Sequence, residues 1–327
     1  MNARPLNNAL IVITGASSGI GRAAALAFAR RGARLALAAR DQQALEEVVR
    51  ECASLDAQAV AIPTDVTQSE AVEQLAHRAA AHGDGRIDIW INNAGVGAVG
   101  SFEETPLAAH EQIVQTDLLG YLRGAYAALP YFKAQHAGVL INTLSVGSWV
   151  AQPYAVAYSA SKYGLRGFSE ALRGELTEWP DIHICDIYPA VMDTPGFRDG
   201  GNYTGTALTP PPPRYDPRRV AEAMVELAMH PQPSKTVGSM ATLLRLGHAL
   251  VPGFAQLSGR LTGLALRNNP EAVPSSGNLF QPPTGERRID GGWRTPRSNA
   301  APWVLGTAAA LLVGWGLLHS LRRHAQH

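Results

Sequence analysis

Short apolar runs alternate with longer segments of helical periodicity over the first 240 residues of the chain. The runs are rich in Val, Ile, Leu and Ala, which is typical of buried strands in a parallel sheet. They occupy residues 9–13, 34–39, 57–62, 87–91, 139–144 and 182–187, and a short last strand is predicted at residues 236–237. This alternation predicts an α/β fold, a Rossmann-like doubly wound parallel sheet that binds its ligand at the carboxyl ends of the strands.

The segments between these runs predict the helices that cover the sheet. Helices are predicted at residues 22–31, 42–54, 68–82, 106–134, 158–177 and 218–229. We expect the long helix to be interrupted at Pro130, because proline lacks the backbone N–H and clashes with the preceding turn. Residues 197–217 are rich in Gly, Thr and Pro, so we expect a lid or binding loop without regular structure there.

The leucine-rich residues 240–266 predict two amphipathic helices separated by Pro252 and Gly253. Such helices can cap a substrate cleft, lie on a membrane surface, or pack on the core or across a dimer. Residues 268–299 are rich in Pro, Gly, Asn and Arg, which indicates a linker or an extended tail. We therefore predict a catalytic domain over residues 6–240 and a helical extension with its linker over residues 241–299.

No charged residue occurs from Ser298 to Leu321, and a helix needs about 20 apolar residues to cross a bilayer. We predict a transmembrane helix over residues 300–321, with a buried or oligomerising helix as the alternative. Arginines before the span and Arg322 and Arg323 after it favour a single-pass anchor whose catalytic domain faces the cytoplasm. A soluble cytoplasmic protein is the alternative, and we expect the chain to form a homo-oligomer.

Composition excludes several other classes of function. The formal net charge of +1 gives no electrostatic reason to expect a nucleic-acid partner. Cys52 and Cys185 are the only cysteines, too few for a disulfide framework, and no clustered spacing of metal ligands is present, so we expect no metal.

A glycine-rich turn joins the first predicted strand to the first predicted helix. It contains Gly15, Ser17, Ser18, Gly19, Ile20 and Gly21. Glycines in this position let the backbone approach a pyrophosphate, and the helix N-terminus offers unpaired N–H groups. The sequence therefore predicts a nucleotide site, although the spacing also suits a plain strand-to-helix turn.

The second predicted strand ends at Ala39, followed by Arg40 and Asp41. An acidic side chain at the end of this strand binds a ribose 2′-hydroxyl, whereas an arginine nearby accommodates a 2′-phosphate. Arg40 therefore favours NADP(H), and Asp41 beside it keeps NAD(H) as the alternative.

Tyr158 and Lys162 stand four positions apart on a predicted helix, and Ser145 precedes the tyrosine by thirteen positions. Residues at i and i+4 share one helix face, so the ammonium would lie beside the phenol. A nearby cation favours the phenolate, which suits a proton donor or acceptor in catalysis.

Together these segments resemble the short-chain dehydrogenase/reductase family, because the glycine turn, Asn92 to Gly95, Ser145, Tyr158 and Lys162 come in that family's order and spacing. The resemblance covers about residues 6–240. It implies that Tyr158 is the general acid/base, that Lys162 binds the nicotinamide ribose and favours the phenolate, and that Ser145 binds the substrate oxygen. It also implies cofactor contacts from Asp65, Val66, Asn92, Ala94, Gly95, Pro189, Val191 and Thr194, beside the glycine turn.

The sequence departs from the family pattern at Asp117, where the family usually has asparagine, and at Ala190, where it commonly has glycine. A charged Asp117 near Lys162 would hold the lysine protonated and offset part of its effect on Tyr158. Alternatively Asp117 substitutes without consequence, because the family's proton relay uses a backbone carbonyl at this position.

We therefore expect an oxidoreductase that transfers a hydride between NADP(H) and an alcohol or carbonyl substrate. Trp149, Tyr154, Phe197 and Tyr203 lie near the predicted cleft and, with the predicted anchor, indicate an apolar substrate. The alternative is an NADP-binding scaffold or sensor with little turnover.

Overall fold

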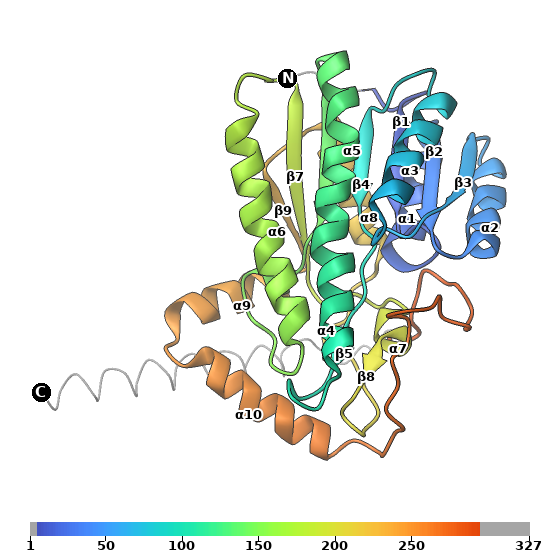
Figure 1. Ribbon diagram of the computed structural model, residues 1–327. Coiled ribbons are helices and arrows are strands. Elements are labelled where there is room, and N and C mark those ends of the chain that lie inside the picture. Colours follow the sequence, from blue (N-terminus) through green and yellow to red (C-terminus); the bar gives the residue numbers. More distant parts are fainter. Residues whose placement is uncertain (1–4, 295–327) are drawn as a thin grey trace, which may run out of the picture.

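A single sheet of seven parallel strands organises the protein, as described by a computed structural model over residues 5–294. The strand order is β3-β2-β1-β4-β6-β7-β9 (Figure 1). The strands are β1 (Leu10–Thr14), β2 (Arg34–Ala39), β3 (Ala59–Pro63), β4 (Ile89–Asn92), β6 (Gly138–Thr143), β7 (Ile182–Pro189) and β9 (Ser234–Val237). The chain order reverses at β1, which confirms the predicted doubly wound fold.

Helices cover both faces of this sheet, so the core lies in two layers. One layer holds α1 (Gly19–Ala29), α2 (Gln42–Ala53) and α8 (Arg218–Met229), and the other holds α3 (Ser69–His82), α5 (Gly120–Gln135) and α6 (Val156–Glu175). Successive side chains of a strand point to opposite faces. In β1, Ile11 and Ile13 accordingly join the first layer, and Leu10 and Val12 join the second.

The predicted break at Pro130 is wrong, because α5 continues through this proline. Pro130 leaves the carbonyl of Tyr126 without its helical partner, but Tyr126 is 76% exposed, so water can bind there. The long helix is instead interrupted earlier, between α4 (Leu107–Val114) and α5, by a π-helical turn over Gln115–Leu119. Single π-turns inside helices are frequent at functional sites, and this one contains Asp117.

The predicted loop over residues 197–217 is irregular over most of its length but contains two short elements. Its first residues belong to α7 (Gly196–Asp199), and β8 (Gly201–Asn202) follows at once. β8 pairs in parallel with β5 (Ala98–Val99), far away in the sequence. This pairing between distant segments explains why the local composition did not predict it.

Two helices follow β9, as predicted, and are separated at Pro252 and Gly253. They are α9 (Ser239–Leu250) and α10 (Phe254–Arg267), which lie together at one end of the molecule (Figure 1). Gly253 has a φ of +75°, a backbone conformation that glycine adopts without strain.

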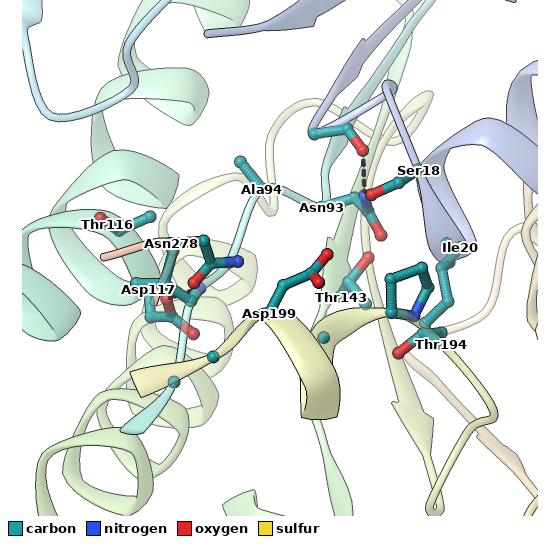
Figure 2. Close-up of a pocket in the computed structure, with 18 of the residues that line it drawn as sticks. Ser18, Ile20, Asn93, Ala94, Thr116, Asp117, Thr143, Thr194, Asp199 and Asn278 are labelled. Atoms are coloured by element: carbon teal, nitrogen blue, oxygen red, sulfur yellow. Dashed lines mark hydrogen bonds between the residues drawn. The ribbon is translucent and has the colours of Figure 1, made fainter. Parts of the chain in front are cut away.

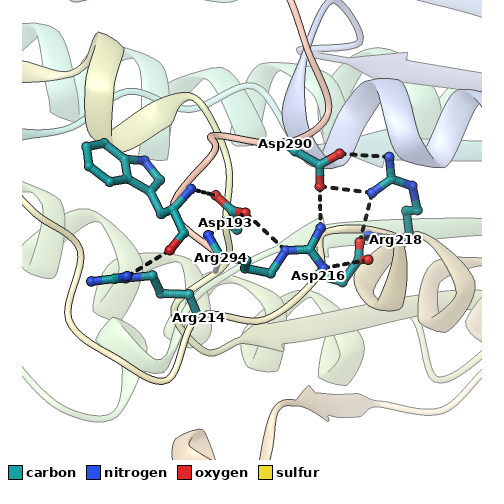
Figure 3. A network of polar contacts seen from close by, with 7 residues as sticks. Asp193, Arg214, Asp216, Arg218, Asp290 and Arg294 are labelled. Atoms are coloured by element: carbon teal, nitrogen blue, oxygen red, sulfur yellow. Dashed lines mark hydrogen bonds and ion pairs between the residues drawn. The ribbon is translucent and has the colours of Figure 1, made fainter. Parts of the chain in front are cut away.

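The tail after α10 is extended and lies against the rest of the chain. We call residues 278–294 the C-terminal strap. Its Leu279 is fully buried, and its end is held by an ion-pair network in which Arg294 contacts Asp193, Asp216 and Asp290 (Figure 3). The strap is therefore bound to the catalytic part of the chain.

The predicted transmembrane helix over residues 300–321 lies outside the described residues. Between residues 5 and 294, no helix is both long and apolar enough to cross a bilayer.

If the strap belongs to the folded core, replacing Leu279 by alanine will reduce stability. We expect the free energy of unfolding to fall by about 2–4 kcal/mol, because a buried leucine side chain is lost. Urea denaturation measures this change. The matched control is Leu264→Ala, whose parent side chain is 57% exposed and which should change stability by less than about 0.5 kcal/mol. Equal effects of the two substitutions would contradict a strap packed into the core.

Candidate active site

One cavity of about 410 Å³ lies at the carboxyl ends of the strands. Figure 2 shows side chains from several elements converging on it, with Ser18 and Thr194 on one side and Asp117 and Asn278 on the other. The predicted site residues that line it are Gly15, Ser17, Ser18, Gly19, Ile20, Arg40, Asp65, Val66, Ala94, Gly95, Asp117, Ser145, Tyr158, Lys162, Pro189, Val191 and Thr194. The structure thus brings together predicted residues that lie as far apart in the sequence as Gly15 and Thr194.

Gly21 and Asn92 do not line this cavity but support its walls. A Cβ atom on Gly21 would lie 2.1 Å from the carbonyl oxygen of Gly15, so only glycine fits beneath the turn. The amide of Asn92 is buried and donates to the carbonyl of Tyr121 at 3.1 Å and to Asn142 Oδ1 at 3.0 Å. Both residues fix the backbone around the site without facing it.

The glycine turn after β1 and the turn after β4 are held in close contact. Thr14 Oγ1 accepts hydrogen bonds from the backbone N–H groups of Asn93 and Ala94, at 3.0 and 3.1 Å. A Cβ atom on Gly15 would lie 2.7 Å from the Cα of Ala94, and Gly15 has a φ of +67°. The result is a narrow cradle of backbone, of the kind in which a dinucleotide phosphate can approach closely.

Arg40 is part-buried at the end of β2 and contacts backbone carbonyls. Its guanidinium donates to the carbonyl oxygens of Asn278 and Leu279, at 2.6 and 3.1 Å. Among residues 5–294 no carboxylate forms an ion pair with it, although Asp65 is near enough to act on its charge. Burial lowers the pKa of Arg40, Asp65 raises it and Arg287 lowers it, so the net shift is downward. The cavity thus has a cation whose charge is not neutralised in an ion pair.

Ser145 and Tyr158 both lie beside the 3₁₀ turn Val146–Ser148, since a Cβ atom on Gly147 would lie 3.4 Å from Ser145 Oγ and 3.3 Å from Tyr158 Cε1. Ser145 Oγ accepts a hydrogen bond from the N–H of Gly147 at 3.0 Å, so its own proton remains available to donate. Tyr158 lies in the first turn of α6, and Lys162 follows one turn later with its Nζ 5.6 Å from the centre of the Tyr158 ring. Tyr158 and Lys162 therefore lie on one face of α6, as predicted.

The ammonium of Lys162 is almost fully buried, with 3% of the residue exposed. It donates to the carbonyl oxygen of Thr143 at 3.2 Å and lies 3.5 Å from Tyr121 Oη and 3.3 Å from Asp117 Oδ2. Burial lowers the pKa of Lys162, but Tyr121, Asp117 and Tyr158 raise it more, so the net shift is upward. The lysine is therefore a charged ammonium at neutral pH.

Asp117 reaches Lys162 from the π-helical turn. Its Oδ1 accepts a hydrogen bond from the N–H of Val96 at 2.7 Å, and its Oδ2 faces the ammonium. Burial raises the pKa of Asp117, and the charge of Lys162 opposes this shift. The carboxyl group is completely buried, so Asp117 and Lys162 form a buried ion pair in the cavity wall.

Sequence reasoning missed the part of the site that the strap contributes. Asn278, Pro282, Pro283 and Arg287 line the cavity, although the composition of their segment indicated only a linker or tail. No local pattern marks them, because they reach the cavity through long-range contacts.

Three of the four aromatic residues expected near the cleft do not line the cavity; of the four, only Phe197 does. The ring of Trp149 is covered by the guanidinium groups of Arg166 and Arg245, which lie 4.0 and 3.7 Å from its centre. Its position is therefore explained by packing under α9 rather than by contact with a substrate.

Comparison with known proteins agrees with this geometry. Residues 9–201 match the family model described as short chain dehydrogenase. The chain belongs to the short-chain dehydrogenase family. An uncharacterized oxidoreductase of Bacillus subtilis, YxnA, is 30% identical over 334 residues, covering 96% of this chain and 92% of that protein. The uncharacterized oxidoreductase Lmo0432 of Listeria monocytogenes is 38% identical over 195 residues, which cover 58% of this chain and 76% of that protein.

Among solved structures, an alcohol dehydrogenase from the archaeon Thermococcus sibiricus, complexed with 5-hydroxy-NADP, is similar with a TM-score of 0.62. It is 28% identical, and the match covers 71% of this chain and 97% of that one. The protein is therefore an oxidoreductase of the dehydrogenase/reductase type, with the fold of that family.

Proposed function

We propose that the protein is an NADP(H)-preferring oxidoreductase that interconverts an alcohol with a ketone or aldehyde. The observation that carries the proposal is that Tyr158, Lys162 and Ser145 share one cavity with the glycine turn of a dinucleotide fold. The cradle at Gly15 and the unneutralised charge of Arg40 fit such a cofactor.

In this proposal the bound nicotinamide cofactor supplies or accepts the hydride, and the protein supplies position and a proton. Hydride transfer to a carbonyl builds negative charge on the substrate oxygen, and fixed donors stabilise that charge. The hydroxyl of Ser145 donates a hydrogen bond to this oxygen, and Tyr158 transfers the one proton that completes the alcohol. In the reverse direction Tyr158 accepts the proton of the alcohol, which the nearby ammonium of Lys162 favours.

The preference for NADP(H) rests on what Arg40 and Asp41 already contact. The Oδ1 atom of Asp41 accepts a hydrogen bond from the N–H of Ala44 at 3.1 Å, and its Oδ2 atom pairs with Arg287 at 2.7 Å. Both oxygens of Asp41 thus already accept a hydrogen bond from the protein, whereas Arg40 presents a cation suited to a 2′-phosphate.

The substrate is apolar in this proposal. Beyond the catalytic side chains the cavity lining includes the apolar residues Val99, Met192, Phe197 and Leu208. These side chains favour the burial of apolar substrate surface.

Asp117 moderates the electrostatics of this site. Its negative charge lies 3.3 Å from Lys162 and offsets part of the positive field that the lysine exerts on Tyr158. The family's usual asparagine would leave that field at full strength.

We also propose that the chain binds membranes through residues 300–321. The charge-free run supports this, and so do exposed leucines on α9 and α10, which together contain no acidic residue. Leu243, Leu246, Leu250, Leu261 and Leu264 are each at least 50% exposed.

Replacing Tyr158 by phenylalanine removes the proton donor while keeping the ring. We expect kcat for NADPH-dependent reduction of apolar ketones and aldehydes to fall at least about 100-fold. NADPH binding, followed by fluorescence titration, should change less than about threefold. If the wild type binds NADPH yet shows no Tyr158-dependent turnover on a broad carbonyl panel, the chain is a cofactor-binding scaffold instead.

Asp117→Asn should shift the pH dependence of alcohol oxidation. The substitution keeps an acceptor for the N–H of Val96 but removes a negative charge, so the phenolate of Tyr158 forms more readily. The acid limb of the kcat/KM profile should move to lower pH. Superimposable profiles would show that Asp117 acts only as a hydrogen-bond acceptor.

Membrane binding is tested by fractionating cells that express the full chain or a version without residues 300–327. The full chain should sediment with membranes and resist high-salt extraction, because apolar burial is insensitive to screening. The truncated chain should appear in the soluble fraction. A full chain recovered in the soluble fraction would rule out the anchor.

A further inference from the structure

The C-terminal strap spans the cavity and contacts three of the segments that we assign to the cofactor. It begins beside Arg40 at the end of β2, continues past the first turn of α1 and ends at Asp193 in the loop after β7. A tail that only trailed from the protein would not make contacts at three separate parts of one cleft.

The first part of the strap lies between the end of β2 and α4. Leu279 is fully buried, and its carbonyl oxygen accepts hydrogen bonds from Arg40 and from Gln112 Nε2, both at 3.1 Å. Asn278 lines the cavity (Figure 2), and its buried Oδ1 atom has no hydrogen-bond partner among the described residues. A buried acceptor without a partner is costly, so a ligand group or a water that binds there would stabilise it.

The middle of the strap is fixed at the N-terminus of α1. The backbone N–H of Gly19 donates to the carbonyl oxygen of Arg288 at 2.9 Å, and Arg22 donates to the carbonyl oxygen of Arg287. Between these two backbone contacts the side chain of Arg287 turns inward and is 9% exposed. The next side chain, Arg288, points outward, is 62% exposed and pairs with Glu286.

The end of the strap is held by a buried carboxylate. Asp193, which is 1% exposed, accepts hydrogen bonds from the N–H of Trp293 at 2.9 Å and from Arg294 Nε at 3.0 Å. Arg294 also pairs with Asp216 and Asp290 (Figure 3). With both ends held, the position of Arg287 in the middle is defined.

Two guanidiniums, those of Arg40 and Arg287, come near each other where the strap meets β2. Arg287 pairs with Asp41 at 2.7 Å, whereas Arg40 donates only to carbonyl oxygens. Burial lowers the pKa of Arg40, Asp65 raises it and Arg287 lowers it. Because Arg40 has no ion pair among residues 5–294 and Arg287 lies nearby, the two guanidiniums can bind an additional anion, and a phosphate monoester carries up to two negative charges at neutral pH.

We infer that Arg287 is a second specificity residue for the adenosine 2′-phosphate of NADP(H), held beside Arg40 by the strap. This inference rests on the proposed cofactor preference and extends it to a residue outside the matched family segment of residues 9–201. The inward turn of Arg287 into the cavity lining supports it.

The test measures dissociation constants for NADPH and NADH, and for 2′,5′-ADP and 5′-AMP, by titration without substrate. Arg287→Ala should weaken the binding of NADPH and of 2′,5′-ADP about 10- to 100-fold, because a charge-assisted contact to phosphate is lost. NADH and 5′-AMP, which lack that phosphate, should change less than about twofold. Arg287→Lys should recover part of the affinity, since it keeps the charge.

Two further variants separate this role from a structural one. Arg288→Ala, whose parent side chain is exposed, should leave all four constants unchanged. Asp41→Asn keeps an N-cap for α2 but removes the carboxylate that competes for Arg287, so NADPH should bind a few-fold more tightly. If the Arg287–Asp41 pair only held the strap, Asp41→Asn would instead weaken binding, as Arg287→Ala does.

The outcomes distinguish the inference from the function on which it rests. A wild type that binds neither NADPH nor NADH would overturn the proposed cofactor. Suppose instead that the wild type binds NADPH, and that Arg287→Ala weakens the binding of NADPH and NADH equally or of neither. That result would overturn only the role of Arg287.

Discussion

The buried ammonium of Lys162 is the constraint around which the active site is built. A charge that is 3% exposed needs partners, because an unpaired buried cation is strongly destabilising. Thr143 and Asp117 provide them from β6 and from the π-helical turn. The π-helical turn widens the helix where Asp117 points inward. The irregular backbone thus positions the carboxylate that pairs with the buried lysine. Tyr158 then has a fixed cation below its ring.

The second feature of the site is that the chain closes its own cleft. The segment that matches the family model contains the glycine turn and α6, whereas the strap comes from beyond that segment. Its backbone carbonyls contact Arg40, and its Arg287 contacts Asp41, so the end of β2 is surrounded by the strap. The strap is therefore placed to take part in cofactor selection. The sequence alone had indicated only Arg40 for that role.

Much of the fold and of the site could be predicted from the sequence because both depend on local patterns. The apolar runs gave six strands close to their observed bounds, and the spacing of Ser145, Tyr158 and Lys162 placed them in one cavity. The misses involve contacts between distant segments. Pro130 lies in a helix where the carbonyl that loses its partner belongs to the exposed residue Tyr126, and Arg287 reaches the cavity because Leu279 and Arg294 hold the strap. No window of sequence contains that information.

The central claim is that this cavity binds an NADP(H) cofactor beside Tyr158, and a crystal structure of the protein with NADPH tests it most directly. We expect the nicotinamide near Tyr158 and Thr194, the pyrophosphate at the glycine turn and the 2′-phosphate between Arg40 and Arg287. A dinucleotide bound elsewhere, or a 2′-phosphate that points away from both arginines into solvent, would contradict the account.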